Sequence, residues 1–242
     1  MEELRGIPRL LRGARGRLWI KRDDLTSPHY GGNKVRTLEL LFGAALARGA
    51  SHVYSTGAYG SNHAAATVIH APRVGLRPGV MLYPQPASPA ALENLRVILS
   101  ARPTISDLPH WSAFPLGLAA LPVQARQRGE QPFIMMPGGA VAQGAIGYVS
   151  AAFELAEQVM AGALPRPRVI VLPVGSNCTA AGLTLGLCLA ARHGLWVDER
   201  GRPAPPRVIA VRVTPWPVTT PTRILGLSRA AGERLAQLGR DP

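Results

Sequence analysis

The feature that most constrains the fold is a repeated alternation of short apolar segments with amphipathic helical segments. Residues 168–174 contain four consecutive apolar residues, as expected for a strand with both faces covered in a parallel sheet. A glycine-containing loop follows, and Leu183, Leu187 and Ala190 then recur at helical spacing. Strands that alternate with helices form right-handed crossovers and a parallel sheet. The sequence therefore predicts an α/β protein.

The same alternation runs through most of the chain. Predicted strands are short apolar segments bounded by glycine or proline, and predicted helices carry one apolar face. We expect strands at 18–21, 52–56, 80–83, 133–136 and 208–213, and helices at 34–45, 61–70, 90–100, 146–160 and 227–238. Residues 104–131 show weak periodicity and contain three well-separated prolines, so we expect irregular structure there.

Composition limits the classes of function. The 242 residues include 47% hydrophobic residues and no low-complexity tract, which is typical of a globular protein with a substantial core. The net charge of +13 would suit a nucleic acid, but the arginines are scattered and no basic run is interleaved with aromatics, so we expect no such partner. The longest apolar stretch, residues 180–191, is too short to span a bilayer. With no secretory signal either, we expect a cytoplasmic protein without a membrane partner.

Neither a disulfide nor a metal site is indicated. Cys178 and Cys188 are ten residues apart in a predicted helix, which separates their Cα atoms by about 15 Å, too far for a disulfide. The six histidines do not fall at metal-ligand spacing with cysteines or carboxylates.

Lys34 is the first candidate for chemistry, because only two of the 27 basic residues are lysines. A primary amine can form a Schiff base with an aldehyde cofactor, whereas a guanidinium group cannot. Gly31 and Gly32 allow close approach of the backbone, and the Asn33 amide can bind a ring oxygen or a carboxylate. The alternative is an ordinary surface lysine.

A second candidate site is the loop that joins the strand at 168–174 to its helix. Backbone N–H groups at a helix start converge on an anion, and Ser176, Asn177 and Thr179 add side-chain donors. An ordinary turn with a threonine cap is the alternative. A phosphate-binding loop together with Lys34 indicates pyridoxal 5'-phosphate as the cofactor.

A third group of polar residues, Ser61-Asn62-His63, opens a predicted helix with Ser61 as its N-cap. Its N–H groups can bind a substrate carboxylate, and its hydroxyl can take part in proton transfer. The alternative is a simple capping cluster, with His63 on the helix surface.

Five segments carry polar or glycine-rich motifs in a fixed order. They are Lys21-Arg22-Asp23-Asp24-Leu25-Thr26, Gly31-Gly32-Asn33-Lys34-Val35-Arg36, residues 56–63, Pro137-Gly138-Gly139 and residues 175–183. In order and spacing they resemble the D-cysteine desulfhydrase and 1-aminocyclopropane-1-carboxylate deaminase family. The resemblance implies the tryptophan-synthase-like architecture of fold-type II pyridoxal phosphate enzymes, with two three-layer αβα domains.

The resemblance also implies roles for individual residues. Lys34 holds the cofactor as a Schiff base and then removes the Cα proton of the substrate, and Ser61 is the second catalytic residue. The implied cofactor-binding residues are Asn33, Lys34, Asn62, Gly175, Ser176, Asn177, Cys178 and Thr179, and the implied substrate-binding residues are Ser61, Asn62 and His63. Residues 1–36 and 146–242 would form a large domain that is incomplete at its C-terminus, and residues 37–145 a small one.

The activity implied is α,β-elimination on a small amino acid. A D-cysteine desulfhydrase-like reaction gives pyruvate, ammonia and sulfide, and the chain is expected to be a homodimer. Deamination of 1-aminocyclopropane-1-carboxylate is the alternative within the family. The chain lacks the final segment that supplies the partner of the pyridine nitrogen in the family, so a truncated, non-catalytic homologue is the other alternative.

Overall fold

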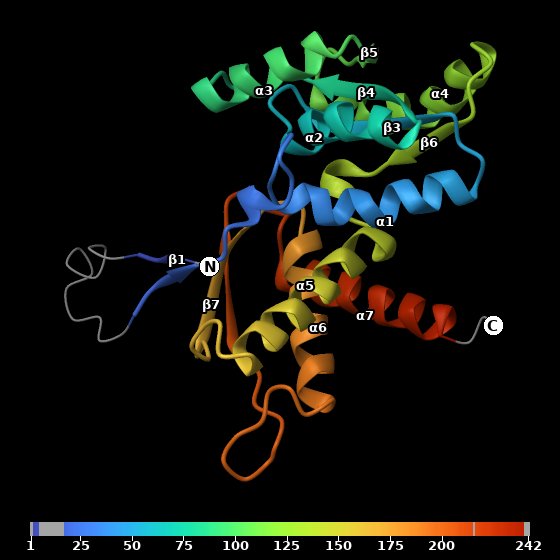
Figure 1. Ribbon diagram of the computed structural model, residues 1–242. Helices are drawn as coiled ribbons and strands as arrows, with labels where there is room; N and C mark the ends of the chain where they lie inside the picture. The colour runs from blue at the N-terminus through green and yellow to red at the C-terminus, as the bar shows by residue number, and fades with distance from the viewer. Residues whose placement is uncertain (1, 5–16, 215, 240–242) are drawn as a thin grey trace.

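The chain was analysed as a computed structural model, which describes residues 2–4, 17–214 and 216–239. Figure 1 shows two groups of strands and helices, with helix α1 (Asn33–Ala47) running between them. One group is built on a four-stranded sheet and the other on a two-stranded sheet. The predicted α/β class with parallel sheets is confirmed.

The larger sheet has the strand order β5-β4-β3-β6, and all neighbouring strands in it are parallel. Tyr54 at the centre of β3 is buried, and a Cβ added to its neighbour Gly79 on β4 would lie 2.2 Å from the Tyr54 ring. Only glycine therefore fits at position 79. The strands are β3 (His52–Ala58), β4 (Arg77–Tyr83), β5 (Thr104–Asp107) and β6 (Pro132–Met135), and the helices are α2 (Asn62–His70), α3 (Pro89–Ser100) and α4 (Phe114–Gln127).

The smaller sheet pairs β7 with β8 in parallel and packs one face against long helices. Helices α5 and α6 pack so closely that a Cβ added to Gly182 would lie 2.0 Å from the Ala145 carbonyl oxygen. Trp196 and Leu172 are buried in the core beneath them. The elements of this group are β7 (Val169–Val174), β8 (Arg207–Arg212), α5 (Ala142–Met160), α6 (Cys178–Arg192) and α7 (Pro221–Leu238).

The other face of the smaller sheet is exposed, which corrects the expectation that both faces are covered. Val171 on β7 is 60% exposed, and its register partner Ile209 on β8 is 38% exposed. Val169, Val211 and Val213 are exposed as well. We call these five side chains the β7–β8 apolar face. An unbroken apolar strand is compatible with one covered face as well as with two, so the sequence alone does not distinguish them.

The prediction of irregular structure at 104–131 is wrong. The segment contains strand β5 and helix α4, preceded by a short 3-10 helix, η4 (Trp111–Ala113). Pro115 lies in the first turn of α4, where its missing N–H is not needed. Leu121 and Ala125 lie on the buried face of α4. The free energy gained by packing this face outweighs the cost of having Pro122 in the helix interior.

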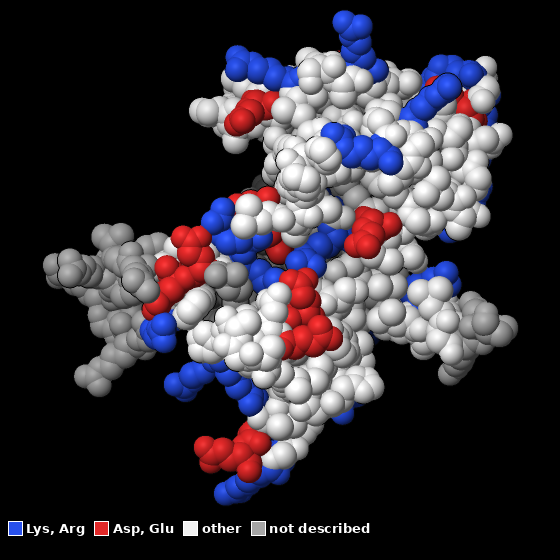
Figure 2. Space-filling model, in the orientation of Figure 1, with Lys and Arg blue, Asp and Glu red and all other residues white. Residues whose placement is uncertain are grey.

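Short elements complete the fold. The predicted strand at 18–21 is confirmed as β2 (Trp19–Ile20), which pairs antiparallel with β1 (Glu2–Glu3). Three more 3-10 helices are η2 (Asp23–Leu25), η3 (Ala71–Val74) and η5 (Pro137–Gly139). Within the described ranges, no helix has both the length and the apolar character needed to cross a membrane. Figure 2 shows basic side chains in several separate places on the visible face, with acidic ones among them.

Candidate active site

Lys34 lies in the first turn of α1, and its amine meets two other parts of the chain. Its Nζ donates to the Gly138 carbonyl oxygen at 3.1 Å and to the Ser176 hydroxyl at 3.5 Å. Burial lowers the pKa of Lys34, although the nearby Cys178 thiol opposes the shift. The amine is therefore held where its neutral, nucleophilic form is favoured.

The start of α6 faces this amine. Strand β7 ends at Val174, and α6 begins at Cys178 after a loop in which Asn177 adopts a left-handed conformation with φ of 70°. The first turn of a helix leaves backbone N–H groups without intrahelical partners, and these attract an anion. The Asn33 amide donates to the Thr179 hydroxyl at 3.0 Å, which joins α1 to α6.

Residues from the segment that precedes α7 form hydrogen bonds with the loop at 175–177. The Gly175 carbonyl oxygen accepts hydrogen bonds from the hydroxyls of Thr219 and Thr214. The Asn177 amide donates to the Val218 carbonyl oxygen at 2.9 Å, so this side chain ties the loop to the segment before α7. No motif in the sequence marks the two threonines, because they reach the loop only through the fold.

The turn Pro137-Gly138-Gly139 closes the side of the site next to Lys34. Gly138 has φ of 65°, and a Cβ added there would lie 2.4 Å from the Ser176 Cβ and 3.2 Å from the Lys34 Nζ. The Cys178 thiol donates to the Gly139 carbonyl oxygen at 3.2 Å. Burial raises the pKa of Cys178, so the thiol stays protonated and acts as a compact packing group.

Ser61 and Asn62 lie at the start of α2 and form hydrogen bonds away from Lys34. Ser61 caps the helix as predicted, accepting from the Ala64 N–H at 3.3 Å. The Asn62 side-chain oxygen accepts from the Asn94 amide at 2.8 Å, and the Tyr30 hydroxyl lies 3.2 Å from the same oxygen while it donates to the Asn94 side-chain oxygen at 2.9 Å. These contacts fix which end of the Asn62 amide is the donor. Tyr30 and Asn94 carry no sequence signal for this role.

His63 differs from its sequence-based expectation. It is 1% exposed rather than on the helix surface, and neither ring nitrogen has a hydrogen-bond partner within the described part of the chain. Its ring reaches toward Gly139. Burial, aided by the charge of Lys34, lowers the pKa of His63 to about 3, so the imidazole is neutral at physiological pH.

Two parallel sheets, and a partly buried lysine that faces the start of a helix, define an α/β protein with an amine beside backbone N–H groups that attract an anion. A family model described as pyridoxal-phosphate dependent enzyme matches residues 2–237, and the chain belongs to this family. The cofactor of the family is pyridoxal phosphate.

Individual relatives agree with this assignment. Nocardicin C-9' epimerase of Nocardia uniformis subsp. tsuyamanensis is 38% identical over 72% of this chain and 54% of its own length. D-cysteine desulfhydrase of Salmonella paratyphi C is 35% identical over 75% of this chain and 56% of its own. A crystal structure of an ACC deaminase homologue superposes with a TM-score of 0.76 at 28% identity, over 97% of this chain and 66% of the other. The chain thus spans about half the length of the curated relatives it matches.

The residues at this site fit pyridoxal phosphate. Lys34 supplies an amine of lowered pKa for the aldehyde, and the first turn of α6 supplies N–H groups for the phosphate. The absence of a side chain at Gly138 lets this turn lie against both Lys34 and Ser176. Among the described residues, no group of three or more His, Cys, Asp or Glu side chains is placed to hold a metal ion.

Proposed function

We propose that the chain acts on a small amino acid by α,β-elimination with pyridoxal phosphate as cofactor, in the manner of a D-cysteine desulfhydrase. The observation that carries the proposal is the amine of Lys34, partly buried and 3.5 Å from Ser176 at the start of α6. D-cysteine and one water would give pyruvate, ammonia and hydrogen sulfide. In this reaction the Cα–H and Cβ–S bonds break, and water replaces the nitrogen at Cα.

The residues of the chain have distinct tasks in this proposal. Lys34 binds the cofactor covalently, and its free amine later accepts the Cα proton, which its lowered pKa still permits. The first turn of α6, from Cys178 to Thr179, holds the phosphate together with Ser176. Asn62, oriented by Tyr30 and Asn94, presents its amide donor to the ring oxygen. When bound, pyridoxal phosphate withdraws electrons from the substrate Cα.

Two lysine variants test the proposal, because Lys21 is the only other lysine. Lys34→Arg and Lys21→Arg both keep a positive charge and each removes one amine. With pyridoxal phosphate, the wild type and Lys21→Arg should develop visible absorbance and, after borohydride reduction, a cofactor adduct on the peptide containing Lys34. Lys34→Arg should show neither and should lose turnover by at least ~100-fold, as expected when a general base is lost. An adduct at Lys21 alone would contradict the proposal.

Deamination of 1-aminocyclopropane-1-carboxylate is the second candidate, supported by the superposition on an ACC deaminase homologue. Both reactions release ammonia from a carbon next to a carboxylate, so the same site serves either. Ammonia release from D-cysteine and from the cyclic substrate at equal concentration separates them. A chain that binds the cofactor at Lys34 but turns over neither substrate would instead be a non-catalytic homologue.

We also propose a division into two domains, with residues 1–36 and 146–242 in the larger and 37–145 in the smaller. The separation of the two sheets supports this division, because the four-stranded sheet lies wholly within the smaller domain. The expected homodimer stays a prediction, which sedimentation of the purified chain tests.

A further inference from the structure

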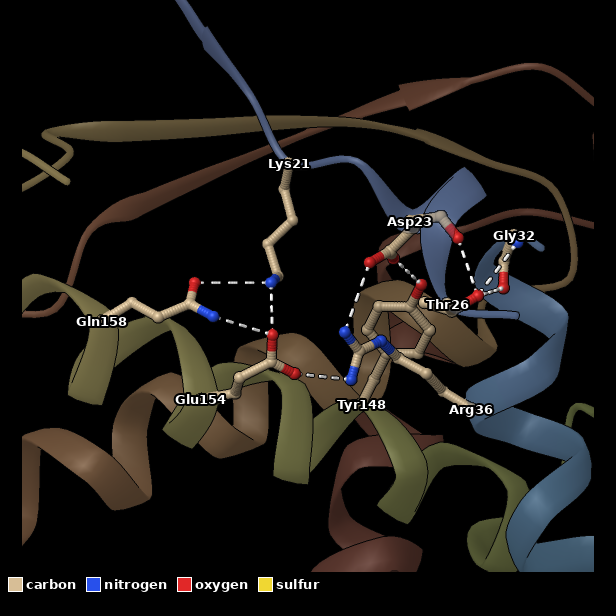
Figure 3. Close-up of polar contacts among 8 residues, drawn as sticks. All are labelled: Lys21, Asp23, Thr26, Gly32, Arg36, Tyr148, Glu154 and Gln158. Atoms are coloured by element: carbon tan, nitrogen blue, oxygen red, sulfur yellow. Dashed lines mark hydrogen bonds and ion pairs between the residues drawn. The ribbon is translucent and has the colours of Figure 1, made fainter. Parts of the chain in front are cut away.

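Asp23 lies just before the lysine-bearing helix and contacts the chain on both sides of Lys34. It begins η2, in the Lys21-Arg22-Asp23-Asp24-Leu25-Thr26 motif, which the proposed function does not use. Figure 3 shows this residue between the start of α1 and the side of α5. Its backbone and its side chain make separate contacts, and both lead to α1.

The backbone of Asp23 holds the residue that caps α1. Its carbonyl oxygen accepts the Gly32 N–H at 2.7 Å and the Thr26 hydroxyl at 2.7 Å. Gly31 packs so closely against the backbone of Asp24 that a Cβ added to it would lie 1.7 Å from the Asp24 carbonyl oxygen. The turn that leads into Lys34 is thus fixed from its N-terminal side.

The side chain of Asp23 holds the residue two positions after Lys34. One carboxylate oxygen accepts the Tyr148 hydroxyl at 2.5 Å, and the other pairs with Arg36 at 3.4 Å. Arg36 also pairs with Glu154 at 2.8 Å, and Glu154 in turn pairs with Lys21 (Figure 3). Asp23 and Arg36 are both largely shielded from solvent, which makes the contact stronger than an exposed ion pair.

Two members of this cluster, Tyr148 and Glu154, have pKa values shifted by their surroundings. Burial, together with the Asp23 charge, raises the pKa of Tyr148, so its hydroxyl remains a donor. Burial opposes ionisation of Glu154, but hydrogen bonds from Lys21 and Arg36 outweigh it and lower the pKa of Glu154 to about 2. Near neutral pH, Tyr148 therefore keeps its proton and Glu154 keeps its negative charge.

We propose that Asp23 is a positioning residue for Lys34, holding Gly32 through its backbone and Arg36 through its carboxylate. This inference rests on the proposed role of Lys34 in binding the cofactor. Losing the carboxylate should leave the fold intact but let the start of α1 move, and a displacement of about 1 Å at a reacting group can cost ~100-fold in rate.

Asp23→Asn tests the inference, with Asp24→Asn as the matched control. The control makes the same chemical change at the next residue, where the carboxylate is exposed and its described bonds go to Arg22. The first readout is the rate at which pyridoxal, which lacks the phosphate, is captured on Lys34, measured by borohydride trapping and peptide mass mapping. The second is the dissociation constant of inorganic phosphate, measured by competition with pyridoxal phosphate.

In Asp23→Asn we expect capture to slow at least ~10-fold, while phosphate binding stays within about twofold of the wild type. Asp24→Asn should match the wild type in both. Unchanged capture in Asp23→Asn would overturn the inference, and so would an equal loss of capture and phosphate binding, which is the result of general destabilisation. If Asp23→Asn does not fold, Tyr148→Phe removes one donor to the same carboxylate and should show the same split to a smaller extent.

Hydrogen exchange without cofactor separates this inference from the proposed function. Asp23→Asn, but not Asp24→Asn, should speed exchange at residues 32–36. If the wild type forms no adduct on Lys34, the proposed function fails, and the exchange result alone decides whether Asp23 holds this turn. Equal exchange in the wild type and Asp23→Asn would overturn the inference.

Discussion

At the scale of single residues, the environment of Lys34 makes its amine easier to deprotonate than an exposed lysine. Its described hydrogen bonds go to a backbone carbonyl and a hydroxyl, and neither is a carboxylate that would stabilise the charged form. Burial therefore dominates and lowers the pKa of Lys34. Lysine supports this chemistry because its amine can lose its proton, whereas arginine stays charged.

Burial of His63 should make the free energy of unfolding depend on pH. Its pKa is about 3 in the folded protein against 6.5 as the ordinary value, so the unfolded chain binds more protons between these limits. Stability should therefore fall as pH decreases, by about 1.4 kcal/mol per pH unit within that window. Between pH 7 and pH 5 we expect the wild type to lose about 2 kcal/mol through this residue in urea unfolding.

His63→Leu is the variant that isolates this effect. It removes the titrating ring and keeps an apolar side chain in a buried position, and the other five histidines are common to both proteins. The difference in free energy of unfolding between pH 7 and pH 5 should be smaller in His63→Leu by the same ~2 kcal/mol. Parallel pH profiles for the two proteins would contradict the assignment.

Gly138→Ala tests whether the turn next to Lys34 must be free of a side chain. The added methyl group meets Ser176 at 2.4 Å, in a backbone conformation with φ of 65°. Gly162→Ala is the matched control, with φ of 71° and nothing within 4 Å. Both variants carry the left-handed penalty of about 1 kcal/mol, and Gly138→Ala should lose ~1–3 kcal/mol more through overpacking. Capture of pyridoxal phosphate on Lys34 should slow only in Gly138→Ala.

Site residues whose role depends on contacts with distant parts of the sequence could not be predicted from the sequence. Lys34 and the loop at 175–177 carry local signals, namely paired glycines and a strand-to-helix turn. Thr219 and Asn94 form hydrogen bonds with residues far away in the sequence, and a lone threonine or asparagine has no distinguishing neighbours. The burial of His63 depends on the turn at Gly139, some 75 residues downstream by direct count, so no local pattern predicts it.

At the scale of elements, hydrophobic periodicity located most of the helices and strands. The exceptions include β5 and α4, both in the segment predicted to be irregular, and in α4 the prolines hide a helix that buries Leu121 and Ala125. Proline breaks a helix only in its interior, and Pro115 sits in the first turn, where the restriction on φ is favourable. A sequence-based prediction that treats every proline as a helix breaker therefore misses a helix of this kind.

Pro122→Ala tests the account of α4. It restores an N–H that can donate to the Leu118 carbonyl oxygen and removes the clash of the proline ring, together worth about 3 kcal/mol. The unfolded chain gains freedom worth ~1 kcal/mol, so we expect a net stabilisation of about 2 kcal/mol in urea unfolding. Pro115→Ala is the control and should be neutral or slightly destabilising. Equal stabilisation by both variants would show that α4 begins elsewhere.

At the scale of the whole molecule, the β7–β8 apolar face is the most unusual surface. Parallel sheets are normally covered on both faces, and a contiguous exposed apolar patch marks a surface that associates with other apolar groups. Val171 is the most exposed strand residue in the face, at the middle of β7. The sequence predicts the strand itself but not its covering, because an apolar run has the same composition in either case.

Val171→Lys should reduce association of the purified chain. A charge in the middle of the face raises its affinity for water, so binding of a hydrophobic fluorescent dye and the concentration dependence of sedimentation should both decrease. Val123→Lys is the matched control, since Val123 is 54% exposed on α4 in the other group of elements. If the two variants behave alike, net charge rather than the β7–β8 apolar face governs association.

The hydrogen bond between Lys34 and Ser176 joins residues 142 positions apart. Closing a loop of this length is entropically costly, so the contact depends on order in the two distant regions that it joins. Partly folded chains, whether newly made or recovering from denaturant, therefore have Lys34 without the loop that faces it. Under the proposed function, stable capture of the cofactor at Lys34 therefore requires the start of α1 and the start of α6 to have come together, so capture at this residue reports long-range assembly.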